Sequence, residues 1–250
     1  MNTESEFVAH EPCNNCGSSD ANSRYSDGHA YCFACQTYTP AEDWTHTHTR
    51  MNTNVQFLGS AEQLQKRRIS EKTNEFYRIY RHGNTLRFPY YDESGRVVGF
   101  KIKTKSKDFH YEGASASCLF GQHLFPTSGK RIVITEGELD AASCYEVMSG
   151  WPMVSLPHGA AAAKKDLQKA IPFLQGYQEI VLFFDNDEAG REAVESASSI
   201  LPAGRVKIAR LDVYKDASDA LQADDKDAIR RAIWDAKPYR PDGIVDGKNL

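Results

Sequence analysis

Two acidic segments each follow an apolar, β-branched run. In RIVITEGELD (131–140) Glu136 comes directly after IVIT, and in EIVLFFDNDEAG (179–190) Asp185 and Asp187 come after VLFF. Carboxylates at the ends of buried strands are costly unless a cation compensates them. Magnesium is the usual compensation, because it binds a few carboxylates and keeps its other positions for water and phosphate oxygens. We therefore expect these three acids to be catalytic and to hold Mg²⁺.

Asp216, in the third acidic segment YKDASDAL, is a further candidate at the same edge of the fold. The alternative for Asp187, Asp216 and Asp219 is that each caps the N-terminus of a helix, where aspartate is favoured. We favour capping for Asp219 and magnesium binding for Asp216. Glu136, between Thr135 and Gly137, has no obvious capping role.

Four lysines alternate in GFKIKTKSKDF, at positions 101, 103, 105 and 107. If the segment is extended, all four project from one face of a strand. The functional interpretation is a groove for a nucleic-acid backbone or a nucleoside triphosphate, which predicts salt-sensitive binding. The alternative is a row of lysines that protects an exposed edge strand from aggregation.

The segment LPHGAAAAKKD places His158 and Gly159 after a strand and Lys164 on a helix. Its small residues allow a ligand to approach the backbone closely. We expect His158 and Lys164 to contact nucleotide or template.

Cys13, Cys16, Cys32 and Cys35 form a C-x₂-C-x₁₅-C-x₂-C pattern. This spacing is that of a structural four-thiolate Zn²⁺ site, although a redox pair or an iron-sulfur site has similar ligands. A module this short has too little core to fold without its metal. Cys118 and Cys144 stand apart, and we interpret them as packing residues.

The loop between the two cysteine pairs, SRYSDGHAY, carries Asp27 and His29. Aspartate accepts a hydrogen bond from cytosine, and histidine stacks on unpaired bases, so this loop is suited to a single-stranded template. Ordinary loop polarity explains the same residues equally well.

The C-terminal half alternates apolar strand-like runs with helical stretches, at 138–149, 161–175, 188–200 and 216–236. Such alternation predicts an α/β domain with a mostly parallel sheet, whose ligands lie beyond the carboxyl ends of the strands. Two short helices and a hairpin-rich sheet, with a turn at Asp92–Gly95 and Ser70 as a helix N-cap, are expected before it.

The net charge of -4 means that any contact with nucleic acid requires local basic patches. No apolar stretch is long enough to span a bilayer, and MNTESEFVAH lacks the features of a signal peptide. We expect a cytoplasmic protein with no membrane partner.

Taken together, TEGELD, FDNDEAGR and KDASD resemble the TOPRIM domain of primases, topoisomerases and some nucleases. A preceding four-cysteine ribbon makes the chain similar to DnaG-like primases, and most similar to the primase half of tailed-phage primase-helicases. The resemblance implies RNA primer synthesis from nucleoside triphosphates on single-stranded DNA, with template contacts at Asp27 and His29. It also implies that Lys101, Lys103 and Lys107 contact nucleotide or template. The resemblance also implies that the protein acts together with a replicative helicase and a replicative DNA polymerase. If the protein is encoded by a phage, it would act in the cytoplasm of the host cell.

The expected domains are a small, β-rich zinc ribbon, a flexible linker, an α+β subdomain of the RNA polymerase domain, a TOPRIM domain, and a tail or the start of a linker to a helicase. Their boundaries are 1–36, 37–56, 57–125, 126–240 and 241–250. No G-x₄-G-K-[ST] motif of a helicase is present. We expect an excised primase fragment rather than a primase that works with a separate helicase.

Two other functions use the same features. A TOPRIM metal-dependent nuclease would use the same acids to attack phosphate with water. A zinc-ribbon adaptor would bind single-stranded DNA without catalysis, and its acids would be lost, whereas all of them are present here.

Overall fold

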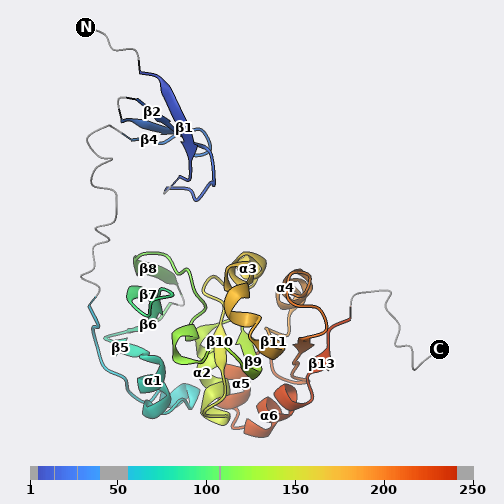
Figure 1. Cartoon of the computed structure of the whole chain (residues 1–250). Helices are drawn as coiled ribbons and strands as arrows, with labels where there is room; N and C mark the ends of the chain where they lie inside the picture. The colour runs from blue at the N-terminus through green and yellow to red at the C-terminus, as the bar shows by residue number, and fades with distance from the viewer. Residues whose placement is uncertain (1–4, 14, 27, 40–55, 107, 241–250) are drawn as a thin grey trace, which may run out of the picture. The chain divides into compact units, whose positions relative to one another are not determined.

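A computed structural model describes residues 5–13, 15–26, 28–39, 56–106 and 108–240 (Figure 1). The predictions for Asp27, for Lys107, for most of the linker and for the C-terminal tail lie outside these residues. The chain divides into two compact units, Met1–Thr53 and Asn54–Leu250, and each is described by itself.

The first unit is built on a four-stranded antiparallel sheet in the order β1-β2-β3-β4. Its strands are β1 (Phe7–Glu11), β2 (Asn22–Tyr25), β3 (Ala30–Cys32) and β4 (Tyr38–Thr39). One cysteine pair follows β1 and the other begins at the end of β3. The strand β4 lies beyond residue 36, in the segment expected to be a linker.

The second unit begins with the short 3₁₀ helix η2, the helix α1 and a four-stranded antiparallel sheet in the order β5-β6-β7-β8. The bounds are η2 (Gln65–Arg67), α1 (Glu71–Tyr77), β5 (Tyr80–His82), β6 (Thr85–Tyr91), β7 (Val97–Lys103) and β8 (Phe109–Gly113). Ser70 caps α1 and Asp92–Gly95 forms the turn between β6 and β7, as predicted.

A five-stranded sheet follows, in the order β10-β9-β11-β12-β13, and only the short β13 is antiparallel to its neighbour. Its strands are β9 (Gly129–Thr135), β10 (Met153–Ser155), β11 (Tyr177–Phe183), β12 (Val206–Ile208) and β13 (Lys237–Pro238). The short 3₁₀ helices η3 (Gln122–Leu124) and η4 (Ala160–Ala162) lie in its connections. The crossover helices are α2 (Glu138–Val147), α3 (Ala163–Leu174), α4 (Glu188–Ser198), α5 (Ala217–Gln222) and α6 (Lys226–Trp234).

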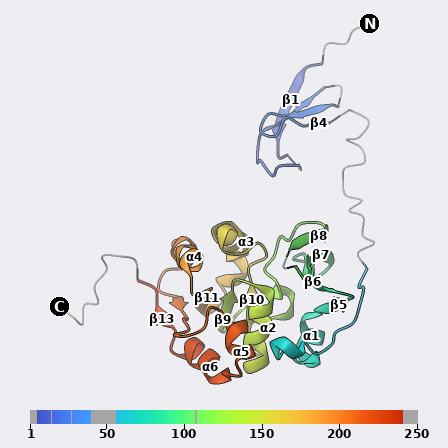
Figure 2. The ribbon, with the colours of Figure 1, turned by 180° about the vertical axis from the view of Figure 1, so that it is seen from behind.

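Helices cover both faces of this sheet, as Figures 1 and 2 show. Alternate residues of the central strands enter two different cores, because successive side chains of a strand point to opposite faces. Val133 and Val181 pack with α2, α5 and α6, and this core continues through Tyr77 of α1 to Phe88 of the antiparallel sheet. Ile132 on the other face packs with α3 and α4. Both central strands are therefore buried on both sides, which explains their unbroken apolar sequence.

Two details of the secondary structure differ from the predictions. The strand β7 ends at Lys103, so Lys105 does not continue the predicted lysine row. Hydrogen bonds among Thr104, Ser106 and Asp108 replace the strand with a tight turn. The predicted helix at 216–236 is two helices, because Asp224 takes a left-handed φ of 64° and Asp225 caps a new helix through the Ala228 amide.

Cys118 and Cys144 are buried, which confirms their interpretation as packing residues. Among the described residues, no helix is long and apolar enough to cross a membrane.

Candidate active site

The two acidic segments emerge at the same edge of the parallel sheet. Thr135 at the end of β9 pairs with Phe183 at the end of β11. Glu136 follows the first of these strands directly, and Asp185 lies two residues after the second. The topology therefore confirms that both segments lie at the carboxyl ends of neighbouring strands, where open α/β sheets place their ligands.

Three carboxylates from different elements form a compact group. Asp140, Asp185 and Asp216 each have an oxygen within 4.8 Å of the others, and each side chain is partly buried. Burial raises the pKa of Asp140 well above its usual range, and the neighbouring Asp216 carboxylate raises it further. Burial also raises the pKa of Asp185. So much negative charge in one partly buried place is unfavourable without a cation.

The sequence analysis missed Asp140. It lies in the first turn of α2, four residues after Glu136, and its Oδ1 accepts a hydrogen bond of 3.0 Å from the Ser218 amide. The helix α2 begins at Glu138, directly after the end of β9, so its first turn stays close to the strand ends. The available signal was therefore a further acid in TEGELD close to the end of the predicted strand.

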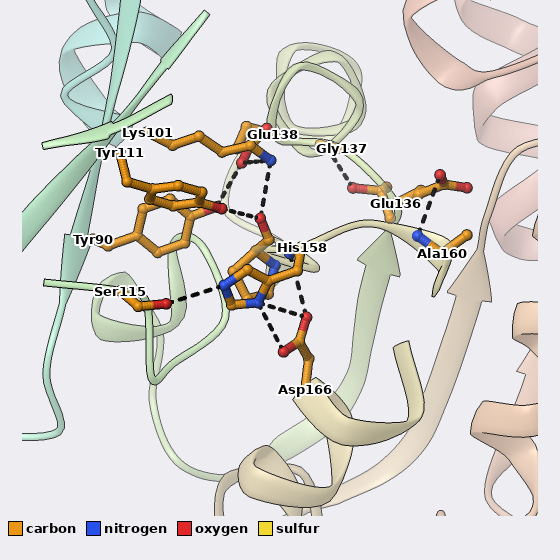
Figure 3. Close-up of polar contacts among 12 residues, drawn as sticks. Tyr90, Lys101, Tyr111, Ser115, Glu136, Gly137, Glu138, His158, Ala160 and Asp166 are labelled. Carbon is orange, nitrogen blue, oxygen red and sulfur yellow. Dashed lines mark hydrogen bonds and ion pairs between the residues drawn. The ribbon is translucent and has the colours of Figure 1, made fainter. Parts of the chain in front are cut away.

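Glu136 has a carboxylate oxygen without a partner among the described residues. Its Oε2 is buried and accepts no hydrogen bond, while Oε1 is 3.4 Å from the Ala160 amide. Burial raises the pKa of Glu136, and the charge of Asp185 raises it further. In Figure 3 this side chain extends away from the neighbouring Lys101 and Glu138. A buried, unpartnered oxygen beside other carboxylates is the arrangement that a bound cation completes.

Lys215 connects Asp185 and Asp187. Its ammonium nitrogen lies 3.1 Å from Oδ2 of each aspartate. The two contacts raise the pKa of Lys215, with the hydrogen bond to Asp187 contributing most. The pKa of Asp187 is lowered by the hydrogen bond from the Gly190 amide and by Lys215. Asp187 is thus the easier of the two aspartates to keep ionised.

Two of the predicted magnesium ligands are also helix caps. Asp187 caps α4 by accepting the Gly190 amide at 2.9 Å, and Asp216 caps α5 by accepting the Asp219 amide at 2.7 Å. The prediction that Asp219 is the cap is wrong, since Asp219 lies inside the first turn of α5. A capping carboxylate still has a second oxygen, so capping and cation binding are compatible.

The donor set fits a hard divalent cation. All three groups are carboxylates, and they come from the first turn of α2, the segment after β11 and the N-cap of α5. Mg²⁺ commonly binds a few carboxylates and keeps its other positions for water and phosphate. The structure brings together Asp185 and Asp216 of the predicted set and adds Asp140. Glu136 and Asp187 lie at the margin of this group.

The lysines of β7 lie next to the acids. Lys101 is buried: its Nζ is 2.8 Å from Oε1 of Glu138 and donates to the Pro157 carbonyl at 2.9 Å (Figure 3). Tyr90 donates to the same glutamate oxygen at 2.5 Å, and burial raises the pKa of Tyr90 well above its usual range. Lys101 therefore ties the antiparallel sheet to the start of α2.

Lys103 is more accessible than Lys101. Burial lowers its pKa, and Arg67 lowers it further by repulsion. Arg67 comes from η2 and donates to the Ser218 hydroxyl at 2.7 Å, next to Asp140. Arg67 was not predicted, because no pattern around QKRR connects residue 67 with α5. Phe109 lies under both lysines, with its ring 4.8 Å from Lys101 Nζ and 5.1 Å from Lys103 Nζ.

His158 and Lys164 lie on the loop and helix after β10. The His158 ring contacts Asp166 through Nδ1 and Ser115 through Nε2 (Figure 3). Lys164 lies exposed in the first turn of α3. The loop also reaches the acids, because it includes the Ala160 amide beside Glu136.

The four cysteines of the ribbon converge. Their sulfur atoms all lie within 4.8 Å of one another, and the Cys13–Cys35 and Cys16–Cys32 pairs are 3.7 Å apart. A tetrahedral zinc with bonds of about 2.3 Å requires sulfur separations of about 3.8 Å. A disulfide would need about 2.05 Å, so the geometry fits a four-thiolate metal site.

The ribbon places His29 in a row of aromatic rings. Its ring stacks on Tyr25 at a centroid distance of 4.3 Å and an angle of 9°, and Tyr38 lies 5.4 Å away. Tyr38 is 59% exposed, so one end of the row faces solvent. Stacked, accessible rings of this kind are suited to unpaired bases.

Comparisons with known proteins agree with this architecture. Residues 133–221 match the Toprim-like family, which covers β9 to α5. The DNA helicase/primase of enterobacteria phage T3 is 38% identical over an alignment of 270 residues that covers 99% of this chain. The chain spans about half, 47%, of the length of that curated relative.

Two solved structures are also similar. The primase fragment of the bacteriophage T7 primase-helicase is 36% identical, with a TM-score of 0.68, and the match covers 91% of this chain and all of that one. The second contains T7 lagging-strand DNA polymerase interacting with primase domains of two subunits bound to an RNA/DNA hybrid. Its matching chain is 37% identical, with a TM-score of 0.66, over 73% of this chain and 93% of that one. The chain belongs to the family of zinc-ribbon and TOPRIM DNA primases represented by the primase region of the phage primase-helicases.

Proposed function

We propose that this protein is a DNA primase that makes short RNA primers from nucleoside triphosphates on a single-stranded DNA template. The observation that carries the proposal is the convergence of Asp140, Asp185 and Asp216 beside Glu136, at the strand ends of a TOPRIM sheet. Lysines from a separate sheet lie near these acids: Lys101 pairs with Glu138, on the same helix as Asp140, and the charge of Asp140 acts on Lys103. A polyphosphate substrate needs both features, since cations neutralise its charge and lysines hold it.

The acids would hold Mg²⁺, which supplies charge neutralisation at the α-phosphate and on the leaving group. In the reaction, the 3′-hydroxyl oxygen of one nucleotide bonds to the α-phosphorus of the next, and the bond from that phosphorus to the β-bridging oxygen breaks. Pyrophosphate leaves with the bonding electrons. Glu136 would take the hydroxyl proton or orient water, and the lack of a described hydrogen-bond partner for its Oε2 supports this role.

Lys103 and Arg67 would contact the phosphates, because both are cationic and border the acids. Lys101 has a different part in the proposal, since Glu138 already holds its ammonium. Lys101 would hold β7 against α2 through Glu138, and it would add positive charge to the site without contacting the nucleotide directly.

The ribbon would hold a structural Zn²⁺ and contact the template through His29 and the rings beside it. The antiparallel sheet and the TOPRIM sheet would then form one RNA polymerase domain. We infer that the partners are a replicative helicase and a replicative DNA polymerase, as the names of the T3 and T7 relatives suggest. The site of action would be the cytoplasm of the host cell.

The test incubates the protein with Mg²⁺, labelled ribonucleotides and a pool of single-stranded templates. The proposal predicts that the wild-type protein makes oligoribonucleotides and that the variants Asp140→Asn and Asp185→Asn make none. Shortened template without synthesis would indicate a nuclease instead. Template binding with neither product would indicate an adaptor.

A further inference from the structure

Asp166 is a buried carboxylate whose described hydrogen bonds all go to one residue. On α3, its side chain is 5% exposed. Its two oxygens lie 2.9 and 3.2 Å from Nδ1 of His158, and Oδ2 also accepts the His158 amide at 3.3 Å. Burying a carboxylate is costly unless it is paired. The cost is offset here by contacts that all fix His158.

These contacts set both the orientation and the proton of the imidazole. A carboxylate accepts, so Nδ1 must carry hydrogen and donate to Asp166. The other nitrogen, Nε2, then faces Ser115 Oγ at 3.3 Å, a long contact (Figure 3). The His158 side chain is 29% exposed and its Nδ1 is engaged by Asp166, so Nε2 is the ring nitrogen that remains for a ligand.

His158 lies between the lysines and the acids. The preceding Pro157 carbonyl accepts hydrogen bonds from Lys101 at 2.9 Å and from Tyr111 at 2.7 Å. Two residues after His158, the Ala160 amide faces Glu136 at 3.4 Å. The loop from Pro157 to Ala160 is thus held at one end by β7 and β8 and at the other by Glu136 at the acidic edge of the TOPRIM sheet. His158 is the polar side chain that this loop exposes.

We propose that His158 binds the polyphosphate of the incoming nucleoside triphosphate through Nε2, and that Asp166 is the positioning residue that keeps Nε2 directed at it. The inference rests on the proposed primase function and assigns a substrate contact within it. A phosphate oxygen replaces Ser115 as the partner of Nε2. A phosphate oxygen only accepts, so this contact requires hydrogen on Nε2 as well as on Nδ1, and the Asp166 carboxylate against Nδ1 favours that charged form of the ring.

The experiment compares wild type with Asp166→Asn, His158→Gln and the double variant, with Gln168→Ala as the control on the exposed face of α3. Asparagine has one acceptor oxygen, whereas aspartate has two. It can therefore still accept the hydrogen bond from the His158 amide, but it accepts a second one from Nδ1 less well than aspartate does. We measure KM for ATP and kcat in primer synthesis, and the affinity for ATP with Mg²⁺ in the absence of template.

Both single variants should raise KM for ATP about tenfold, with a smaller change in kcat and an unchanged melting temperature. The double variant should be no worse than His158→Gln alone, because Asp166 acts through the histidine. Additive losses, or a loss of stability without a change in KM, would overturn the proposal. If wild type makes no primers, the proposed function fails, and weaker ATP binding in both variants would still support the contact.

Discussion

The ammonium group of Lys215 lies 3.1 Å from a carboxylate oxygen of Asp185, at the centre of the proposed cation site. It lies at the same distance from Asp187. Lys215 therefore neutralises part of the charge that a divalent cation would also neutralise. The two cations compete for the same oxygens, although Lys215 is 54% exposed and has room to withdraw.

Lys215→Met should strengthen Mn²⁺ binding in the absence of nucleotide, because it removes this competitor. The same change should lower the free energy of unfolding by about 1 kcal/mol in chelator, since an exposed ion pair contributes little. Electron paramagnetic resonance measures free Mn²⁺ in a titration. Lys169→Met, on the exposed face of α3, is the control, and unchanged or weaker Mn²⁺ binding in Lys215→Met would show that the lysine supports the site.

Asp140→Asn should abolish primer synthesis and yet stabilise the metal-free protein. A raised pKa in the folded state means that ionised Asp140 is less favourable there than in the unfolded chain. This penalty is absent below the unfolded pKa and grows as pH rises toward the folded pKa. The variant should therefore gain about 1 kcal/mol at pH 7.5 and little at pH 3.5, as measured by urea unfolding. The exposed Asp227→Asn should change neither property, and destabilisation at pH 7.5 would contradict the account.

Lys101→Met should destabilise the protein by about 3 to 5 kcal/mol, because it leaves Glu138 buried and unpaired. The double variant Lys101→Met with Glu138→Gln should regain most of this stability but not primer synthesis. Lys103→Met has no such buried partner, so it should weaken nucleotide binding with a smaller loss of stability. Equal unfolding free energies for the two single variants would contradict the different roles.

Cys32→Ser should release zinc and unfold the ribbon, because metal binding contributes roughly 10 kcal/mol or more to the folding of such modules. Synthesis from a template should be lost more completely than extension of a preformed primer. Cys118→Ser, in the second unit, should retain zinc and both activities. Equal loss of initiation and extension in Cys32→Ser would remove the separate role of the ribbon in template contact.

Glu179, which lies outside the proposed active site, should make the free energy of unfolding depend on pH. It accepts from Lys207 and from Arg131, each at 2.6 Å, and these contacts lower its pKa. Its stabilisation is complete above the unfolded pKa of about 4.3 and is lost as pH falls through the lower folded value. Glu179→Gln should cost about 1 kcal/mol at pH 7 and almost nothing at pH 2.5. A constant difference across this range would contradict the assignment.

The sequence predicted the parallel sheet and its acidic edge because strands buried on both faces read as unbroken apolar runs that end in a turn. It predicted that the four cysteines of the ribbon lie together because their spacing is local. Asp140 and Arg67 were missed for different reasons. Asp140 required the exact start of α2, whereas Arg67 reaches Ser218 across 151 positions of sequence, and no local pattern carries such a contact. The ion pair between Lys101 and Glu138 could not be predicted from the sequence either, because tertiary packing decides whether a lysine is buried.

The most direct test of the central claim is anomalous X-ray diffraction from crystals of this protein grown with Mn²⁺. The account predicts a strong peak within coordinating distance of Asp140, Asp185 and Asp216, which disappears in Asp185→Asn. Well-ordered carboxylates without any peak at saturating Mn²⁺ would contradict it.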